Sequence, residues 1–231
     1  MSRRSRSGPR GIATASGQRI PRPVAVCLTL TVIAAAGCGL MLGALTPLPS
    51  TSPQPQAVPV PPSVPPVPSL SPGQIAPPGL SRSTPTVVDI AAIGVHSPVT
   101  PVGLDRDGTI EAPDLDQPHQ TGWYSHGPAP GQIGTAALVG HVDSRRSGAA
   151  VFYDLGSLET GDSIVVSRRD GRDVTFTVDL VESYPKKKFP YGAVFTNTGY
   201  AALRLITCGG NFDTKRRSYT HNIVVYATMA T

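Results

Sequence analysis

Two residues in the C-terminal part of the chain have the types that nucleophilic catalysis requires. His141 comes after the apolar run 136–139 and Cys208 comes after the mostly apolar run 203–207, so each stands where a predicted strand ends. A thiol becomes an effective nucleophile when a neighbouring base favours the thiolate, and histidine is the usual base. We therefore predict that Cys208 and His141 meet in one groove. The alternative is that His141 is an ordinary strand-end histidine.

Cys208 is the only cysteine outside an apolar segment near the N-terminus. The chain has three cysteines, and Cys27 and Cys38 both lie in that segment. A domain with a single cysteine has no internal disulfide, so its thiol is either a buried core residue or a reactive group. This pattern favours Cys208 as the candidate nucleophile.

The N-terminal part of the chain has the pattern of a membrane anchor. Six arginines lie within residues 1–23, and the 22 residues of the run 24–45 carry no charge. Such a run, at about 1.5 Å per residue, crosses a hydrocarbon core of roughly 30 Å, and clustered arginines stay on the cytoplasmic side. We predict a single-pass helix in the cell membrane, with the C-terminal domain extracellular. A cleaved signal peptide and a lipoprotein modified at Cys38 are the alternatives.

Composition divides the chain into four parts. Of 25 prolines, 13 lie within residues 47–79, where no helix, central strand or core is expected. Residues 83–231 hold all 15 acidic residues beside 13 lysines and arginines, so the basic pI reflects the N-terminal arginines and not a nucleic-acid surface. The predicted parts are a basic cytoplasmic tail, a transmembrane anchor, a Pro-rich disordered linker and a catalytic domain, at residues 1–23, 24–46, 47–82 and 83–231.

From residue 86 on, short β-branched runs alternate with clusters of Gly, Pro and Asp. This spacing predicts an all-β barrel or sandwich and not alternating strands and helices. A helical pattern is confined to a turn near residues 151–158. The expected strands are residues 86–93, 99–104, 135–141, 162–167, 173–181, 202–207 and 222–227.

Four segments in order resemble one enzyme family, the sortases. Residues 134–141 (GTAALVGH) resemble the sortase strand that delivers the catalytic histidine, and residues 203–208 (LRLITC) resemble the strand that ends in its cysteine. Residues 152–162 lie between them and resemble the F-x-x-L and L-x-x-G-D segment of the family. Residues 218–227 (SYTHNIVVYA) resemble the closing strand of the actinobacterial class F. The resemblance covers essentially the whole predicted domain.

The resemblance implies a closed eight-stranded β-barrel and a cysteine transpeptidase. Cys208 would attack the Thr carbonyl of a Leu-Pro-x-Thr-Gly-like (LPxTG-like) sorting signal, cleave between Thr and Gly, and form a thioester. His141 would protonate the leaving amine and deprotonate the incoming one. The implied partners are surface proteins with a C-terminal sorting signal and a cell-wall amine acceptor, and no cofactor or metal is implied.

The family also uses an arginine that donates hydrogen bonds to the substrate carbonyl or its oxyanion. Many relatives place it just before the last strand, where this chain has Thr220 and His221. Neither residue is a permanent cation, so we predict that Arg217 takes this role, with Arg216 as the alternative. The competing interpretation of residues 215–217 is a solvated basic loop.

Three other functions compete with this interpretation. An L,D-transpeptidase would carry a Ser-His-Gly-Cys type motif, and the chain has no histidine two residues before Cys208. A metal site built from His141, Cys208, Asp143 and His221 lacks the paired spacings of zinc ligands, and no dense carboxylate loop indicates calcium. A peptide-binding barrel without catalysis has no need of a lone exported thiol.

Two segments near the predicted site carry further expectations. Residues 183–198 are expected to help form the substrate groove. The three lysines at 186–188 are expected to form a solvated turn, and the alternative is that they attract an acidic partner. Gly209 and Gly210 follow the nucleophile, and paired glycines after a strand are typical of a turn. The alternative is that their amides help to stabilise an oxyanion.

Overall fold

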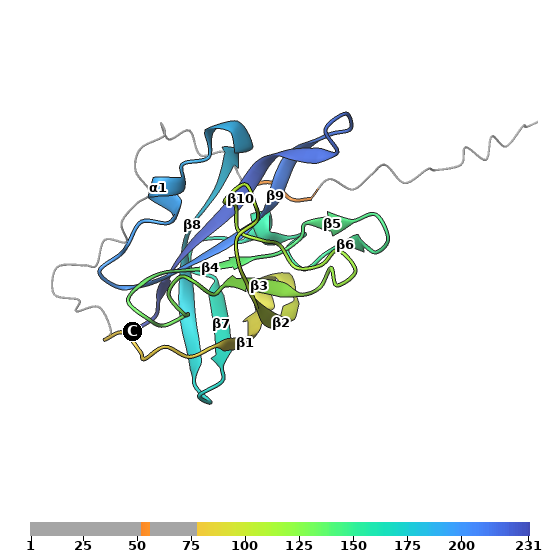
Figure 1. Cartoon of the computed structure of the whole chain (residues 1–231). Coiled ribbons are helices and arrows are strands. Elements are labelled where there is room, and N and C mark those ends of the chain that lie inside the picture. Colours follow the sequence, from red (N-terminus) through yellow and green to blue (C-terminus); the bar gives the residue numbers. More distant parts are fainter. Residues whose placement is uncertain (1–51, 56–77) are drawn as a thin grey trace, which may run out of the picture. The chain divides into compact units, whose positions relative to one another are not determined.

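The computed structural model describes residues 52–55 and 78–231, shown in colour in Figure 1. These residues belong to one compact unit, Pro47–Thr231. The predicted tail and transmembrane anchor, residues 1–23 and 24–46, lie outside the described residues, as does most of the predicted linker. Among the residues that are described, no helix is long and apolar enough to cross a membrane.

Strands are the main regular secondary structure of the described residues, as the short β-branched runs predict. The strands are β1 (Pro85–Ile90), β2 (Val95–Val102), β3 (Thr121–Tyr124), β4 (Gly134–Val139), β5 (Asp143–Ser144), β6 (Gly148–Ala149), β7 (Ser163–Arg168), β8 (Asp173–Pro185), β9 (Ala201–Asp213) and β10 (Ser218–Met229). The helical elements are the 3-10 turns η1 (Ala91–Ile93), η2 (Leu155–Ser157) and η3 (Lys186–Lys188) and the short helix α1 (Tyr191–Val194).

Eight of the described strands close a barrel, in the order β1-β2-β3-β4-β9-β10-β8-β7. β7 pairs back to β1, so the sheet has no free edge. Most neighbours are antiparallel, whereas β2 pairs with β3 and β4 pairs with β9 in parallel. Figure 1 shows the long β9–β10 hairpin extending from the barrel wall. The all-β, closed eight-stranded barrel predicted above is confirmed.

The first predicted strand, residues 86–93, is divided in the structure. β1 ends at Ile90, and Ala91–Ile93 form the turn η1. Gly94 ends this turn with a φ of 64°, a conformation that glycine adopts without steric cost. The chain then reverses into β2, which pairs antiparallel with β1. The apolar run was continuous in sequence but covers two elements.

The barrel interior is the main hydrophobic core, because alternate residues of each strand point inward. All six residues of β4 are buried, which confirms that this run is a central strand covered on both faces. The fully buried interior side chains include Val88, Ile90, Leu138, Ile164, Val166, Phe176, Val178, Leu203, Leu205, Ile223 and Val225.

A second apolar cluster covers the outer face of β8, β9 and β10. Its buried members are Val194, Val224 and Tyr226, with Leu180, Tyr184, Phe189, Phe195 and Ile206 packed against them. Arg204 is buried in this layer, where its Nε donates to the carbonyl of Val194 at 3.2 Å and its guanidinium lies 4.3 Å from the centre of the Tyr226 ring. Strand alternation therefore puts Arg204, Ile206 and Cys208 on the outer face of β9.

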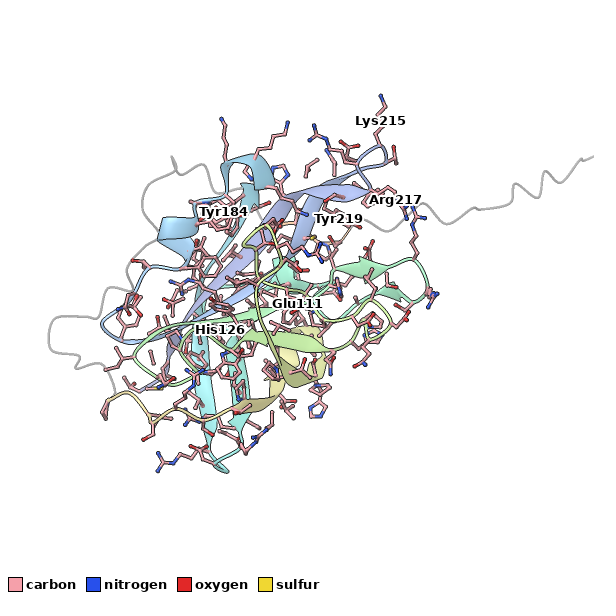
Figure 2. All side chains as sticks on the ribbon, in the orientation of Figure 1. Glu111, His126, Tyr184, Lys215, Arg217 and Tyr219 are labelled. Atoms are coloured by element: carbon pink, nitrogen blue, oxygen red, sulfur yellow. The ribbon has the colours of Figure 1, made fainter. Side chains whose placement is uncertain are left out.

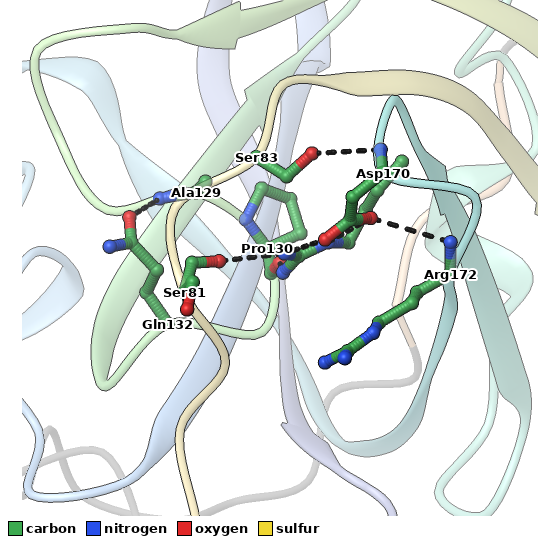
Figure 3. Close-up of polar contacts among 8 residues, drawn as sticks. Ser81, Ser83, Ala129, Pro130, Gln132, Asp170 and Arg172 are labelled. Atoms are coloured by element: carbon green, nitrogen blue, oxygen red, sulfur yellow. Dashed lines mark hydrogen bonds and ion pairs between the residues drawn. The ribbon is translucent and has the colours of Figure 1, made fainter.

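Arg168 fastens the chain before β1 to the barrel, and its side chain is 0% exposed. Its Nη1 donates to the Pro130 carbonyl at 2.7 Å, and its Nη2 donates to the Ser81 carbonyl at 2.6 Å. Nη2 also lies 2.7 Å from Oδ2 of Asp170, whose own amide donates to Ser83 Oγ at 3.1 Å. Figure 3 shows Ser81, Pro130 and Asp170 converging at this contact. The domain start is thus held by a buried cation.

This contact predicts a pH-dependent loss of stability. The hydrogen bond from Arg168 holds the pKa of Asp170 below its ordinary value of 3.8. A carboxyl whose folded pKa is lowered adds stability above its unfolded pKa, and that stability is lost as the pH falls through the folded pKa. We expect Asp170→Asn to lower the Tm at neutral pH, and the difference from wild type to shrink once the pH falls below 3.8. Circular dichroism melts across this range measure the effect.

The exposed Asp173 supplies the control for this test, because Asp173→Asn removes the same charge from the same turn region. A Tm difference for Asp170→Asn that stays constant from neutral to acid pH would contradict the prediction.

Candidate active site

Cys208 lies in β9, where its backbone partner in β10 is Asn222. Its thiol is half-buried and is the only free cysteine in the part of the chain that the structure describes. Strand alternation turns it to the outer face, away from the barrel interior. The thiol is therefore not sealed in the core, and the reactive alternative is the one that this placement favours.

His141 is carried to Cys208 by the parallel pairing of β4 and β9. The register matches Val139 with Ile206, and the amide of Gly140 donates to the Ile206 carbonyl at 3.1 Å. The strand pairing ends at Val139, and the same register continued by two positions would align His141 with Cys208. The two residues come from strands that are distant in sequence, and the barrel brings them together.

The loop between β2 and β3 orients the His141 ring. Nε2 of His141 lies 2.6 Å from the carbonyl oxygen of Pro113. A carbonyl accepts hydrogen bonds only, so Nε2 carries the hydrogen and Nδ1 is the unprotonated nitrogen of the neutral ring. Nδ1 is thus the atom of His141 that can take up a proton.

A hydrogen bond between Tyr219 and Asp143 joins the His141 segment to the start of β10. The Tyr219 hydroxyl donates to Oδ2 of Asp143, which follows His141 by two residues. Burial, and then the hydrogen bond and negative charge of Asp143, raise the pKa of Tyr219. The Tyr219 ring also packs edge-on against Phe212, with ring centres 5.1 Å apart. The Tyr219–Asp143 hydrogen bond thus connects the segment after His141 with the start of β10.

Lys186 lies beside the Cys208 thiol, a contact that was not predicted from the sequence. Its Nζ donates to Sγ of Cys208 at 3.3 Å and to Oγ of Ser218 at 3.1 Å. Lys186 is half-buried, whereas Lys187 and Lys188 are exposed. The expectation of a solvated turn is therefore wrong for Lys186. The sequence carries no local signal for it, because the three lysines are identical neighbours.

The predicted arginines lie in the turn that joins β9 and β10. Arg217 is exposed and has a φ of 52°, and its side chain has no hydrogen-bond or ion-pair partner within the described residues. Arg216 is also exposed, and its Nε lies 3.8 Å from Oδ2 of Asp213. Figure 2 shows Lys215 and Arg217 at the end of this hairpin, with Tyr219 nearer the barrel. The role predicted for Arg217, or for Arg216, stays a prediction.

Thr220 and His221 occupy the positions where many relatives place the arginine. Oγ1 of Thr220 lies 2.8 Å from Nδ1 of His221 and accepts a hydrogen bond from the amide of Asn211 at 3.1 Å. These contacts hold both side chains within the β9–β10 hairpin. Neither has a contact with Cys208 among the interactions of the described residues.

Residues 52–55, part of the predicted linker, pack beside the nucleophile strand. Ser52 is 6% exposed, and Oε1 of Gln54 accepts a hydrogen bond from the amide of Gly210 at 2.8 Å. A Cβ on Gly156 would lie 2.2 Å from the carbonyl oxygen of Pro53, so the close approach requires glycine there. The Gly210 amide is thus engaged by Gln54 and does not point freely to an oxyanion.

The Gln54 contact predicts slow exchange of one amide. We expect Gln54→Ala to speed hydrogen exchange of the Gly210 amide about fivefold, since a hydrogen bond contributes about 1 kcal/mol. Exchange followed by NMR measures this effect, with Gln117→Ala, at an exposed position of the β2–β3 loop, as the control. Equal Gly210 exchange in Gln54→Ala and wild type would show that residues 52–55 do not stay bound in solution.

These residues are equipped for acyl transfer through a thiol. Cys208 supplies the nucleophile, His141 supplies a nitrogen that accepts a proton, and Lys186 supplies a positive charge at the sulfur. Within residues 52–55 and 78–231, no group of three or more His, Cys, Asp or Glu side chains is arranged to hold a metal ion.

Comparison with known proteins agrees with this chemistry. The family model described as a Sortase domain matches residues 88–230. Similar solved structures include sortase A from Corynebacterium diphtheriae, at 19% identity and a TM-score of 0.49 over 65% of this chain and 62% of that chain. Sortase C-1 from Streptococcus pneumoniae has 22% identity and a TM-score of 0.49, over 63% of this chain and 66% of that chain. A Clostridium perfringens sortase D5 transpeptidase has 18% identity and a TM-score of 0.47, over 64% and 79%.

The chain spans 62% of the length of the Corynebacterium diphtheriae sortase A structure. No curated protein matches its sequence. The Sortase domain match covers more than half of the 231 residues, and it includes both His141 and Cys208. The chain therefore belongs to the sortase family, whose members are cysteine transpeptidases.

Proposed function

We propose that this chain is a membrane-anchored sortase, related to class F, that acts on the outer side of the cell membrane. It cleaves an LPxTG-like sorting signal between Thr and Gly and transfers the surface protein to a cell-wall amine. The observation that supports this most strongly is the parallel pairing of β4 with β9 inside the Sortase domain match, because its register runs towards His141 and Cys208. The apolar run 24–45 and its flanking arginines support the anchor.

The first half of the reaction forms a thioester. Nδ1 of His141 takes up the proton of the Cys208 thiol, and the resulting thiolate attacks the Thr carbonyl carbon of the signal, whose oxygen takes up negative charge. The carbon–nitrogen bond to Gly then breaks, and His141 gives its proton to the leaving amine. The product is an acyl-enzyme on Cys208 and a free peptide that begins with Gly.

The second half transfers the acyl group. The acceptor amine attacks the thioester carbonyl, and Nδ1 of His141 takes the proton that the amine loses. The carbon–sulfur bond breaks, which returns the Cys208 thiolate and leaves a new amide bond. Arg217, with Arg216 as the alternative, is proposed to donate hydrogen bonds to the oxyanion in both halves. From its turn, Arg217 would have to reach back over the hairpin.

Mass spectrometry of the intact protein tests this function. The full chain in detergent is incubated with an LPxTG peptide and either triglycine or a diaminopimelate-type amine, beside Cys208→Ala. We expect an acyl adduct on the wild-type protein and an amine-exchanged peptide, both absent with Cys208→Ala. A folded wild-type protein that gives neither product across a broad peptide library would overturn the proposal and favour a peptide-binding barrel.

A further inference from the structure

We propose that Lys186 is a second cation of this active site, beside the arginine proposed above. Its ammonium stabilises negative charge on Cys208 Sγ and then donates a hydrogen bond to the oxyanion of the bound substrate. The second part rests on the proposed transpeptidase function, whereas the first part concerns the thiol alone. The two parts are therefore tested separately.

The contacts place the ammonium between the thiol and the start of β10. Nζ of Lys186 lies 3.3 Å from Cys208 Sγ and 3.1 Å from Ser218 Oγ. The Ser218 hydroxyl donates to the Tyr219 carbonyl at 3.3 Å, so its oxygen is free to accept from Lys186. These two hydrogen bonds fix the position of the Lys186 ammonium beside the sulfur.

The barrel topology explains why a long side chain is needed. β10 lies between β8 and β9, and Asn222 of β10 has Tyr184 of β8 on one side and Cys208 of β9 on the other. The β8 and β9 backbones are thus two strand spacings apart, about 10 Å. Lys186, two residues beyond Tyr184, crosses β10 with its four-carbon stem to reach the sulfur.

The charge of Lys186 is not used elsewhere in the described structure. The ion pairs within residues 52–55 and 78–231 are His96–Asp89, Arg146–Asp116, Arg168–Asp170 and Arg216–Asp213, so no carboxylate neutralises Lys186. A half-buried cation without a carboxylate partner is stabilised by negative charge on its neighbour, and that neighbour is Cys208. Thiolate formation supplies the missing counter-ion.

An ammonium group also has a donor to spare. It carries three N–H bonds, and two of them are directed to Cys208 and Ser218. When the substrate carbonyl carbon bonds to Sγ, its oxygen develops negative charge one atom from the sulfur, within reach of the third N–H. Lys186 thus supplies from η3, directly after β8, a positive charge that Thr220 and His221 do not supply from β10.

The thiol part is tested with two alkylating agents of similar shape and different charge. Iodoacetate is an anion and iodoacetamide is neutral, so a cation at the sulfur raises the rate ratio of iodoacetate to iodoacetamide. We expect Lys186→Met in the full chain to lower this ratio about tenfold, and Lys186→Arg to preserve most of it. A ratio unchanged in Lys186→Met would overturn the proposal.

Two neighbouring lysines provide matched controls. Lys187→Met and Lys188→Met remove the same charge from exposed positions in the same turn, and we expect the wild-type ratio in both. If the rate ratio falls equally in all three variants, the probe responds to the total positive charge of the turn and not to Lys186 in particular, which also overturns the proposal. Thermal melts confirm that each variant is folded, and because the readout is a ratio, a uniform change in accessibility of the thiol cancels.

The oxyanion part is tested by the first half-reaction. We expect Lys186→Met to slow thioester formation with an LPxTG peptide about 100-fold, and Arg217→Ala to slow it less. The reverse order would assign the oxyanion to Arg217 and refute this part for Lys186. If no protein forms a thioester but the alkylation ratio still falls in Lys186→Met, the transpeptidase proposal fails while the thiol part stands.

Discussion

Replacement of His141 by alanine is expected to lower the rate of peptide transfer by about 10²- to 10⁴-fold, the range for loss of a general acid and base. The β4–β9 register sets His141 beside Cys208, and its Nε2 is held by Pro113, which leaves Nδ1 for proton transfer. Without this ring, the leaving amine has no proton donor. Single-turnover formation of the thioester and steady-state transfer to triglycine both report the loss.

His126 provides the control for this substitution. It is exposed, and it contacts Tyr124 at the end of β3, with ring centres 5.7 Å apart. Because β3 runs antiparallel to β4, His126 lies towards the opposite end of β4 from His141. We expect His126→Ala to keep wild-type transfer. A His141→Ala protein that retained a tenth or more of the wild-type rate would show that another group moves the proton.

Replacement of Gly140 by alanine is expected to disturb catalysis through the backbone that carries His141. A Cβ on Gly140 would lie 2.6 Å from Cγ1 of Val151 and 2.6 Å from Cδ2 of Phe152, and Phe152 is fully buried. Neither neighbour can move freely, because both pack in the core. Overpacking of this kind costs about 1–3 kcal/mol of stability.

The catalytic cost follows from the position of Gly140 between β4 and His141. The hydrogen bond from its amide to the carbonyl of Ile206 is the last backbone contact that the β4–β9 pairing makes before His141. A shift of about 1 Å at a catalytic group reduces rates up to 100-fold, so we expect Gly140→Ala to lower kcat by about 10- to 100-fold with a smaller change in KM. Gly192→Ala is the control, because a Cβ there meets nothing within 4 Å. Wild-type kcat in a folded Gly140→Ala protein would refute the prediction.

The fold followed from local patterns to a large degree. β-Branched runs predicted strands at β4, β7, β8 and β9, and the complete burial of β4 agrees with its unbroken apolar run. The error at residues 86–93 arose because apolar character continues through the turn η1, which Gly94 ends. The barrel closure came from the family resemblance, since short strands alone fit a sandwich equally well.

Some residues of the candidate site could likewise be predicted from the sequence, and others could not. His141 and Cys208 stood out as chemically capable residues at the ends of apolar runs, and each has a sequence context of its own. Lys186 had none, because it sits between a strand end and two further lysines. The contact of residues 52–55 with Gly210 was equally invisible, since a proline-rich stretch carries no periodicity that indicates a binding partner.

By itself, the sequence determined most of the long strands and singled out Cys208 as the candidate nucleophile, because strand propensity and a cysteine that stands alone in its domain are local properties. Tertiary structure alone decided which side chains meet. The parallel pairing of β4 with β9 sets His141 beside Cys208, and the place of β10 between β8 and β9 brings Lys186 to the sulfur. Contacts of this kind depend on strand order and register around a closed barrel, and neither is encoded in the residues adjacent to a contact.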